Sequence, residues 1–368
     1  MSRLLEFPGF IDVHVHFRDP GVPGAETTAS GLRAAARGGF AAVVTMPNTS
    51  PACDNVEALR RQIAIASKSG TGVTLMPSAC ITRGRLGREV SDLESLAGAG
   101  CAFFTDDGSY VLDDKVMEEA MRRAAKLEMC VCQHAMDPRE IGNGVIRDCA
   151  IARAHGLPVI PVLAETKAIR RDVSICRVTG CRLHIQHIST AAGVAIVRDA
   201  QREGLPVTAE ATPHHLLLSC ESIPEDDANY KMAPPLGNDE DRAELRRAVK
   251  DGVLMFATDH APHPAEAKSR GFLSSANGII GLETAVAITY SVMVEEEGMD
   301  AEDWAKAWWK MPRKILSPYA MASLDAAPST IVDVGEWRSV EVAKFASLSR
   351  NCPYDGLQFD CWPREAER

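Results

Sequence analysis

The stretch Gly9-Phe-Ile-Asp-Val-His-Val-His-Phe-Arg-Asp-Pro-Gly21 combines an apolar run with two histidines at its end. Residues 10–15 are mostly apolar, which is typical of a strand buried on both faces. His14 and His16 are two residues apart, so on a strand their side chains point to the same face. Buried imidazoles need polar partners, either a carboxylate or a metal ion. Because imidazole is the commonest metal-binding side chain, this pair, followed by Arg18 and a Pro-Gly turn, indicates a metal site.

Composition and charge restrict the classes of protein to which the chain can belong. The 368 residues are enough for one barrel of about 250 residues with additions, or for two smaller domains. Hydrophobic residues make up 46% and charged residues 24%, as in ordinary globular proteins. The net charge of −10 argues against nucleic acid as a partner. The sequence contains no apolar run long enough for a transmembrane helix, so we expect no membrane partner.

The N-terminus and the cysteines indicate a cytoplasmic location. The opening residues, MSRLLEFP, lack the apolar segment of a signal peptide and lead directly into the first strand. The 11 cysteines are an odd number, lie mostly inside apolar runs, and form no CxxC pair with zinc-finger spacing. We therefore expect reduced, buried cysteines in a cytoplasmic protein.

Strand-like runs alternate with helical patterns along most of the chain. Alternating units of this kind predict a parallel sheet, and eight of them predict a closed (β/α)8 barrel, the TIM barrel. An open doubly wound sheet is the alternative, but no GxGxxG turn follows the first strand. A longer helical and irregular region covers residues 137–179. The expected strands are residues 10–15, 41–46, 73–76, 101–104, 130–132, 183–185, 207–209 and 253–257.

The C-terminal tail has a different pattern. Short strand-like segments, such as residues 329–334 and 356–359, alternate there with polar turns. We therefore expect residues 1–316 to form the barrel and residues 317–368 to form a small, reduced β appendage built from the tail.

Polar side chains stand at the ends of several of the expected strands. In a (β/α)8 barrel, the carboxyl ends of all strands meet at the face that carries the active site. A catalytic Zn²⁺ takes about three protein ligands, so six are enough for two ions if one carboxylate bridges them. The six candidate ligands are His14, His16, Asp107, His134, His187 and Asp259.

Such a pair of ions would determine the chemistry. Two ions about 3.5–4 Å apart can hold a hydroxide between them, because a bound metal lowers the pKa of its water from about 15.7 to about 7. The second ion polarises the carbonyl under attack. A leaving nitrogen needs a proton, and Asp259 is the candidate general acid/base because it can reach the bridging water. The implied reaction is hydrolysis, or reversible condensation, at an amide-like carbon.

Several motifs, spread over residues 9–285, stand in the order of a known family. These motifs are FIDVHVHFRDPG, TMPNT, FFTDDG, the segment around His134, HIST, EATPHHL, KMAPPL, ATDHAPH and GIIGLETA. With them the sequence resembles the dihydroorotases of the cyclic amidohydrolase superfamily. The combination is highly specific, whereas His-x-His alone would indicate only the superfamily.

The resemblance implies that the two ions are zinc and that Asp259 is the sixth ligand and the catalytic base. Many relatives bridge the metals with a carboxylated lysine on the fourth strand, but residues 101–105 contain no lysine. The chain resembles instead the dihydroorotases that place an aspartate there. The TDDG motif favours Asp107, with Asp106 as the alternative because strand ends are uncertain by a residue or two. The histidines that look like zinc ligands are His14, His16, His134 and His187.

By the same resemblance, Arg18 and Asn48 look like the clamp for the α-carboxylate of the substrate, with His263 as a third contact. Arginine can bind a carboxylate through two parallel hydrogen bonds. The family's KxNPPL stretch is altered here, so Ala233 replaces an asparagine and Gly237 replaces an arginine. Losing one amide contact would cost on the order of 1 kcal/mol.

Three further departures from the family pattern concern the rest of the chain. The usual His-Cys-Glu-Asp sequence is His-Ala-Met-Asp from His134. Because the sequence begins almost at the first expected barrel strand, we expect the family's N-terminal strands to be missing. The segment 140–164 also differs from the expected pattern.

The leading hypothesis is a dizinc dihydroorotase that reversibly cyclises N-carbamoyl-L-aspartate to L-dihydroorotate in de novo pyrimidine biosynthesis. A second hypothesis is a hydantoinase- or allantoinase-like cyclic amide hydrolase, although such enzymes usually carry the lysine that is absent here. A third is a non-catalytic partner of aspartate transcarbamoylase, but such relatives typically lose the metal histidines that this chain keeps. The resemblance also suggests a homodimer, or an active enzyme bound to aspartate transcarbamoylase.

Overall fold

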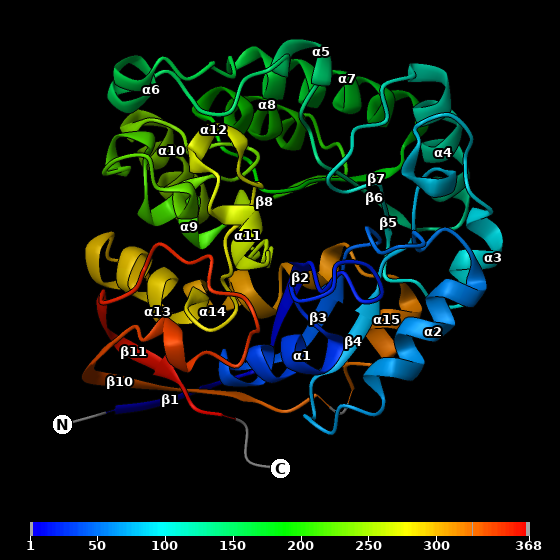
Figure 1. Cartoon of the computed structure of the whole chain (residues 1–368). Helices are drawn as coiled ribbons and strands as arrows, with labels where there is room; N and C mark the ends of the chain where they lie inside the picture. Colours follow the sequence, from blue (N-terminus) through cyan, green and yellow to red (C-terminus); the bar gives the residue numbers. More distant parts are fainter. Residues whose placement is uncertain (1–2, 326, 366–368) are drawn as a thin grey trace.

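A closed ring of eight parallel strands lies at the centre of the computed structural model, which describes residues 3–325 and 327–365 (Figure 1). The ring consists of one sheet of three strands and one of five. Parallel bridges between Val15 and His260 and between Ala79 and Phe104 join the two sheets at both seams. The expected barrel is therefore confirmed, and the open doubly wound sheet is wrong. The strands are β2 (Phe10–Val15), β3 (Phe40–Thr45), β4 (Thr74–Pro77), β5 (Phe104–Thr105), β6 (Cys130–Gln133), β7 (Arg182–Ile185), β8 (Val207–Ala211) and β9 (Leu254–Phe256).

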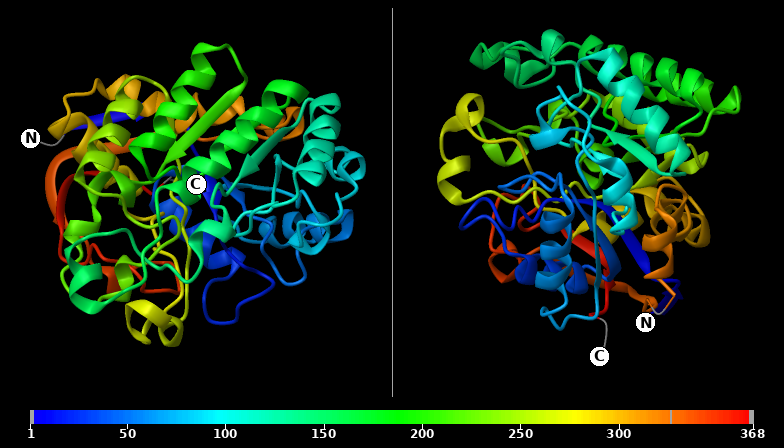
Figure 2. Two further views of the ribbon diagram at one scale, coloured as in Figure 1. Left: turned by 90° about the horizontal axis from the view of Figure 1, so that it is seen from above. Right: turned by 90° about the vertical axis from the view of Figure 1, so that its right-hand side faces the viewer.

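Helices surround these strands, as the two views of Figure 2 show. Most begin at a side chain that accepts a hydrogen bond from the first turn, such as Thr27 before α1 or Asn238 before α10. The longer helices are α1 (Thr28–Arg37), α2 (Val56–Ala66), α4 (Asp114–Lys126), α7 (Leu163–Thr179), α8 (Ala191–Arg202), α10 (Asp239–Lys250) and α14 (Ala301–Trp309). The shorter ones are α3 (Leu93–Gly98), α5 (Pro138–Ile141), α6 (Ala150–His155), α9 (Pro213–Leu217), α11 (Ala265–Lys268), α12 (Gly271–Ser274), α13 (Ala285–Tyr290) and α15 (Pro318–Ala322).

Apolar side chains fill both sides of the strand ring. One buried cluster joins strand residues such as Ile11 and Met255 to Leu316 from the segment after α14. A larger cluster packs the strands against the helices, and it includes Trp304 and Trp308 of α14. The burial of residues 10–15 is complete, as expected for a strand covered on both faces. All 11 cysteines are buried and free, as the sequence predicts.

The two tryptophans of α14 share a single hydrogen-bond acceptor. The indole nitrogens of Trp304 and Trp308 both donate to the Thr289 hydroxyl oxygen, each over 3.1 Å. All three side chains are fully buried. Because water cannot reach this point, the two N–H groups depend on Thr289 for their hydrogen bonds.

The segment that departs from the family pattern is tied to the loop after β7. The buried Arg147 donates to the Ile160 carbonyl at 3.0 Å and to the Ser189 hydroxyl at 3.1 Å. Glu165, in the first turn of α7, accepts the backbone N–H groups of Ser189 and Thr190 at 3.0 and 3.1 Å. The segment therefore supports the loop that also carries His187.

A small antiparallel sheet lies beside the barrel and combines both ends of the chain (Figure 1). Its order is β1–β10–β11, with β1 at Arg3–Phe7, β10 at Thr330–Ser339 and β11 at Gln358–Pro363. The β appendage is thus confirmed, but the expectation that the tail alone builds it is wrong, since β1 pairs along β10. The predicted domain boundary between residues 316 and 317 stays a prediction. The described residues do not include Met1, Ser2, Ala326 or residues 366–368.

The helices of the described residues are too short or too polar to span a bilayer.

Candidate active site

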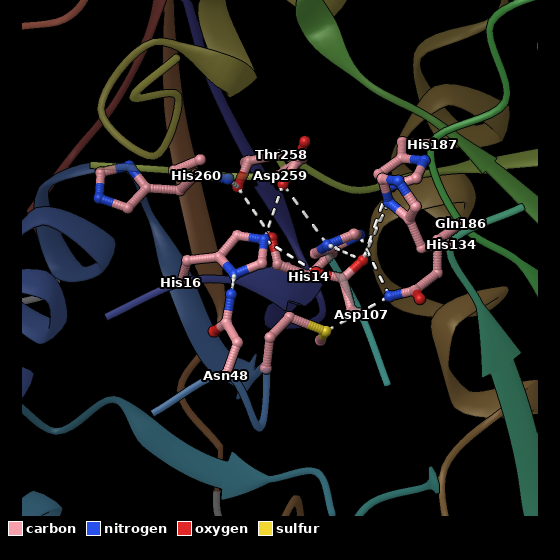
Figure 3. A network of polar contacts seen from close by, with 12 residues as sticks. His14, His16, Asn48, Asp107, His134, Gln186, His187, Thr258, Asp259 and His260 are labelled. Atoms are coloured by element: carbon pink, nitrogen blue, oxygen red, sulfur yellow. Dashed lines mark hydrogen bonds and ion pairs between the residues drawn. The ribbon is translucent and has the colours of Figure 1, made fainter. Parts of the chain in front are cut away.

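Six buried side chains from five strand ends meet at one face of the barrel (Figure 3). His14 belongs to β2, and the other five residues lie in the first few positions after β2, β5, β6, β7 and β9. This convergence follows from the parallel arrangement, which brings all carboxyl ends of the strands to the same rim. The six residues are those that the sequence singled out, namely His14, His16, Asp107, His134, His187 and Asp259.

Asp107 lies at the centre of this cluster. Its Oδ2 atom faces His16, and its Oδ1 atom faces the other three imidazoles (Figure 3). Asp259 Oδ1 lies 3.0 Å from His16 Nε2 and 3.4 Å from His14 Nε2. The distances from the Asp107 carboxylate are 3.2 Å to His16 Nε2, 3.4 Å to His14 Nε2, 3.6 Å to His134 Nδ1 and 3.6 Å to His187 Nε2.

The donor set fits divalent metal ions. Donor atoms of His14, His16 and Asp259 lie within 4.8 Å of one another, and so do those of His14, Asp107 and His187. His14 Nε2 and Asp107 Oδ1 are buried atoms without a hydrogen-bond partner. Leaving such atoms unpaired costs about 1–3 kcal/mol each, and a cation between them would remove that cost. Imidazole nitrogens and carboxylate oxygens are ordinary ligands of zinc.

Both carboxylates of the cluster are held in the ionised form. Burial by itself would raise the pKa of Asp107, but His14 and His16 lower that pKa well below its usual value. The pKa of Asp259 is lowered in the same way, with His14 and His16 outweighing burial. The site therefore presents two anionic groups to a bound cation at neutral pH.

Three residues of the site have strained backbones. Arg18, His187 and Asp259 have φ angles of 51°, 32° and 48°, in the left-handed region that residues other than glycine rarely adopt. Such conformations cost about 1–3 kcal/mol each and persist only where surrounding contacts fix them. Their concentration at one rim is typical of a functional site.

Asp106 points away from the cluster. Its carboxylate accepts hydrogen bonds from the backbone N–H of Thr82, over 3.1 Å, and from the Thr82 hydroxyl. Arg85 donates to the backbone carbonyl of Asp107 on the same loop. Of the two adjacent aspartates, Asp107 is thus the one whose side chain faces the histidines.

The predicted substrate residues lie in or beside the cluster. A cavity of about 160 Å³ is lined by Arg18, Asn48 and Ala233, together with every residue of the cluster except His14. The Asn48 amide lies 2.8 Å from His16 Nδ1, and Arg18 donates to the carbonyl of Pro262. His263 does not line this cavity, because its Nε2 atom is hydrogen-bonded to the Asn277 carbonyl at 2.7 Å.

The two substituted positions of the KMAPPLG stretch differ in their surroundings. Ala233 lies on the cavity wall, so a larger side chain there would enter the cavity. Gly237 lies elsewhere, packed against the loop after β7. A Cβ atom at this position would stand 2.6 Å from the Ser189 carbonyl oxygen and 2.6 Å from Asp241 Cβ, so this backbone leaves no room for an arginine.

The sequence analysis missed the buried polar groups behind the cluster. Glu210 of β8 is fully buried and contacts His14 and His184. Burial would raise the pKa of Glu210, but these two histidines lower it to about 2. Asp12 accepts the backbone N–H groups of His14, at 3.2 Å, and of Thr258, at 3.0 Å. The available signal was an acidic residue inside an otherwise apolar strand pattern.

Comparisons with known proteins give consistent results. A family model described as "Dihydro-orotase-like" matches residues 3–192. Dihydroorotases from Halalkalibacterium halodurans and Bacillus caldolyticus are each 41% identical to the chain, covering 97% of it and 84% of the relative.

Solved structures show the same fold. An L-hydantoinase (dihydropyrimidinase) from Arthrobacter aurescens matches with a TM-score of 0.84 at 22% identity, covering 98% of this chain and 83% of that one. A dihydroorotase from Saccharomyces cerevisiae, in complex with 5-fluoroorotic acid, matches with a TM-score of 0.73 at 15% identity, covering 98% of both chains.

Proposed function

Because the chain belongs to the dihydroorotase family, we propose that it reversibly cyclises N-carbamoyl-L-aspartate to L-dihydroorotate in de novo pyrimidine biosynthesis. The observation that carries this proposal is the buried cluster of four imidazoles and two carboxylates around Asp107. Members of this family are metal-dependent cyclic amidohydrolases, and the cluster supplies the donors that such chemistry needs.

The proposed cofactor is two Zn²⁺ ions per chain. His14, His16 and Asp259 would hold one ion, and His134 and His187 would hold the other. Asp107 would be shared, since its two oxygens face different histidines. When bound, such ions ionise a water molecule near neutral pH and polarise the carbonyl that is attacked.

The proposed role of Asp259 is to move the proton. In ring opening, its carboxylate takes the proton of the attacking water and gives it to the leaving ring nitrogen. In cyclisation the same carboxylate takes the proton from the attacking carbamoyl nitrogen and gives it to the departing oxygen. Asp259 lines the cavity and lies 3.0 Å from His16, so its carboxylate is within reach of a water bound in the cluster.

Arg18 and Asn48 are proposed to bind the α-carboxylate of the substrate. Both line the cavity beside the cluster, and a guanidinium group complements a carboxylate in charge and shape. His263 is proposed as a third contact, which requires its ring to turn from the Asn277 carbonyl toward the cavity. Binding the carboxylate here would place the amide carbon of the substrate over the cluster.

A hydantoinase- or allantoinase-like activity is the second candidate. The similarity in fold to the L-hydantoinase supports it. The absence of a lysine from residues 101–105, which include β5, argues against it. A non-catalytic role beside aspartate transcarbamoylase is not favoured, because the whole donor set is retained. We further propose that the protein is cytoplasmic. It would act as a homodimer, or as an active enzyme in complex with aspartate transcarbamoylase.

A substrate comparison tests the proposed function. The zinc-loaded protein would be assayed with dihydroorotate, hydantoin and allantoin at equal concentrations, in parallel with Asp259→Asn. We expect turnover of dihydroorotate by the wild type and a loss of at least about 100-fold in the variant, the scale of general acid–base catalysis. Metal-loaded protein that leaves dihydroorotate unchanged while hydrolysing hydantoin or allantoin would contradict the proposal.

A further inference from the structure

Glu210 connects two residues of the candidate metal site through a single carboxylate. It lies on β8 and is fully buried, on the barrel side of the cluster. Its Oε1 atom lies 2.5 Å from His14 Nδ1 and accepts the backbone N–H of His187 at 3.1 Å. Its Oε2 atom lies 2.8 Å from His184 Nε2. Among the described residues, the hydrogen-bond partners of this carboxylate are therefore all histidines, and two of the three belong to the site.

The contact with His14 determines which ring nitrogen faces the cluster. With Nδ1 against a carboxylate oxygen, the ring proton belongs on Nδ1, and Nε2 keeps its lone pair. His14 Nε2 is the buried atom that lacks a partner, and it lies 3.4 Å from both Asp107 and Asp259. A histidine that binds a metal through one nitrogen commonly donates the other to a carboxylate, which fixes its orientation and raises its basicity.

The contact with His187 fixes a strained backbone. His187 has a φ of 32°, which a residue with a side chain adopts only where its surroundings enforce it. The hydrogen bond from its backbone N–H to Glu210 is formed at this residue itself. The side chain of the same residue points at Asp107, with Nε2 at 3.6 Å from Oδ1.

Glu210 is itself held in place by a third histidine, His184. His184 Nδ1 lies 2.9 Å from the Thr208 hydroxyl, so a chain of contacts runs from Thr208 through His184 to Glu210. Buried charge networks of this kind contribute little net stability compared with apolar packing. A gain in stability is therefore not a sufficient reason for a buried Glu210–His184 pair next to the site. We propose that Glu210 is a positioning residue of the metal centre, which sets the ring tautomer of His14 and the backbone of His187 together. This inference rests on the proposed metal-dependent function.

The test measures metal affinity rather than turnover. Glu210→Gln keeps the size of the side chain but removes its negative charge, so the neutral amide no longer raises the basicity of the His14 ring as a carboxylate does. We expect its Zn²⁺ dissociation constant, measured by chelator competition on the full-length apoprotein, to rise 10- to 100-fold. Asp172→Asn is the matched control, because Asp172 is a fully buried carboxylate on α7 outside the cluster. Its Zn²⁺ affinity should equal that of the wild type.

Glu210→Asp provides a second variant if Glu210→Gln does not fold, and it should weaken Zn²⁺ binding because the shorter side chain cannot span His14 and His184. The Co²⁺-substituted protein gives an independent readout, since its visible spectrum should change in Glu210 variants and remain unchanged in the control. Folded Glu210→Gln with wild-type affinity would overturn the inference, as would failure of both Glu210 variants to fold. Wild-type protein that binds no divalent ion would overturn the proposed function as well, so the two failures are distinguishable.

Discussion

Replacing each of the two adjacent aspartates by asparagine should separate their roles. Asp107→Asn removes the negative charge at the centre of the histidine cluster, whereas Asp106→Asn changes a side chain that faces Thr82. Both substitutions keep the volume of the side chain, and the two positions are neighbours. Any difference between the variants therefore reports the direction in which each side chain points.

The structure gives the scale of the effect at Asp107. The contacts of 3.2 to 3.6 Å with the four histidines would place an ion among them less than about 4 Å from the carboxylate. Two unit charges at 4 Å interact by about 4 kcal/mol at an effective dielectric constant of about 20, and a divalent ion interacts more strongly. Because 1.4 kcal/mol is a tenfold change, Zn²⁺ affinity should fall by at least about 1,000-fold.

Asp106→Asn should behave differently. The amide oxygen of the new side chain can still accept the Thr82 N–H, and the Thr82 hydroxyl can rotate to accept from the new NH2 group. The expected cost is about 1 kcal/mol of stability, with no change in Zn²⁺ affinity. Chelator competition and metal analysis of both purified variants provide the comparison. Zinc retained by Asp107→Asn, or lost from Asp106→Asn, would refute the reasoning.

Substitutions at two buried positions outside the site, Thr289 and Asp172, give further tests. Thr289→Val should lower the free energy of unfolding by about 2–4 kcal/mol in denaturant titrations, because the indole N–H groups of Trp304 and Trp308 lose their shared acceptor. Thr289→Ser keeps the hydroxyl and loses one buried methyl group, so it should cost only about 1 kcal/mol. Equal stabilities of the two variants would contradict this. Burial raises the pKa of Asp172 to about 6 despite its contact with Arg171. The folded state therefore binds this proton more tightly than the unfolded state, so the contribution of Asp172 to stability should decrease by about 2 kcal/mol as pH rises from 4 to 7. The stability of the wild type relative to Asp172→Asn should follow this decrease, and a pH-independent difference would refute it.

The features that the sequence could predict are those with a local pattern. The mostly apolar run that contains His14 in β2 and the polar residues at later strand ends were sufficient for the barrel and the cluster. The small sheet could not be assigned completely, because the pairing of β1 with β10 joins residues more than 300 positions apart. Nothing local distinguishes such an edge strand from an N-terminal extension.

The sequence also could not predict the direction in which individual side chains point. Only the short β5 strand and the turn after it determine that Asp107 faces the histidines and Asp106 faces Thr82. Glu210 was overlooked because its partners come from β2 and the end of β7, far away in the sequence. The segment 140–164 gave no sign that Arg147 would contact Ser189 near the site.

The proposed pair of ions around Asp107 can be tested directly. Crystals of the zinc-loaded protein would be used for diffraction on both sides of the zinc absorption edge. We predict two anomalous peaks at the barrel mouth, one beside His14 and His16 and one beside His134 and His187, with Asp107 between them. No peak in this cluster from zinc-replete protein, or a pair of peaks bridged by Asp106, would contradict the proposed metal centre.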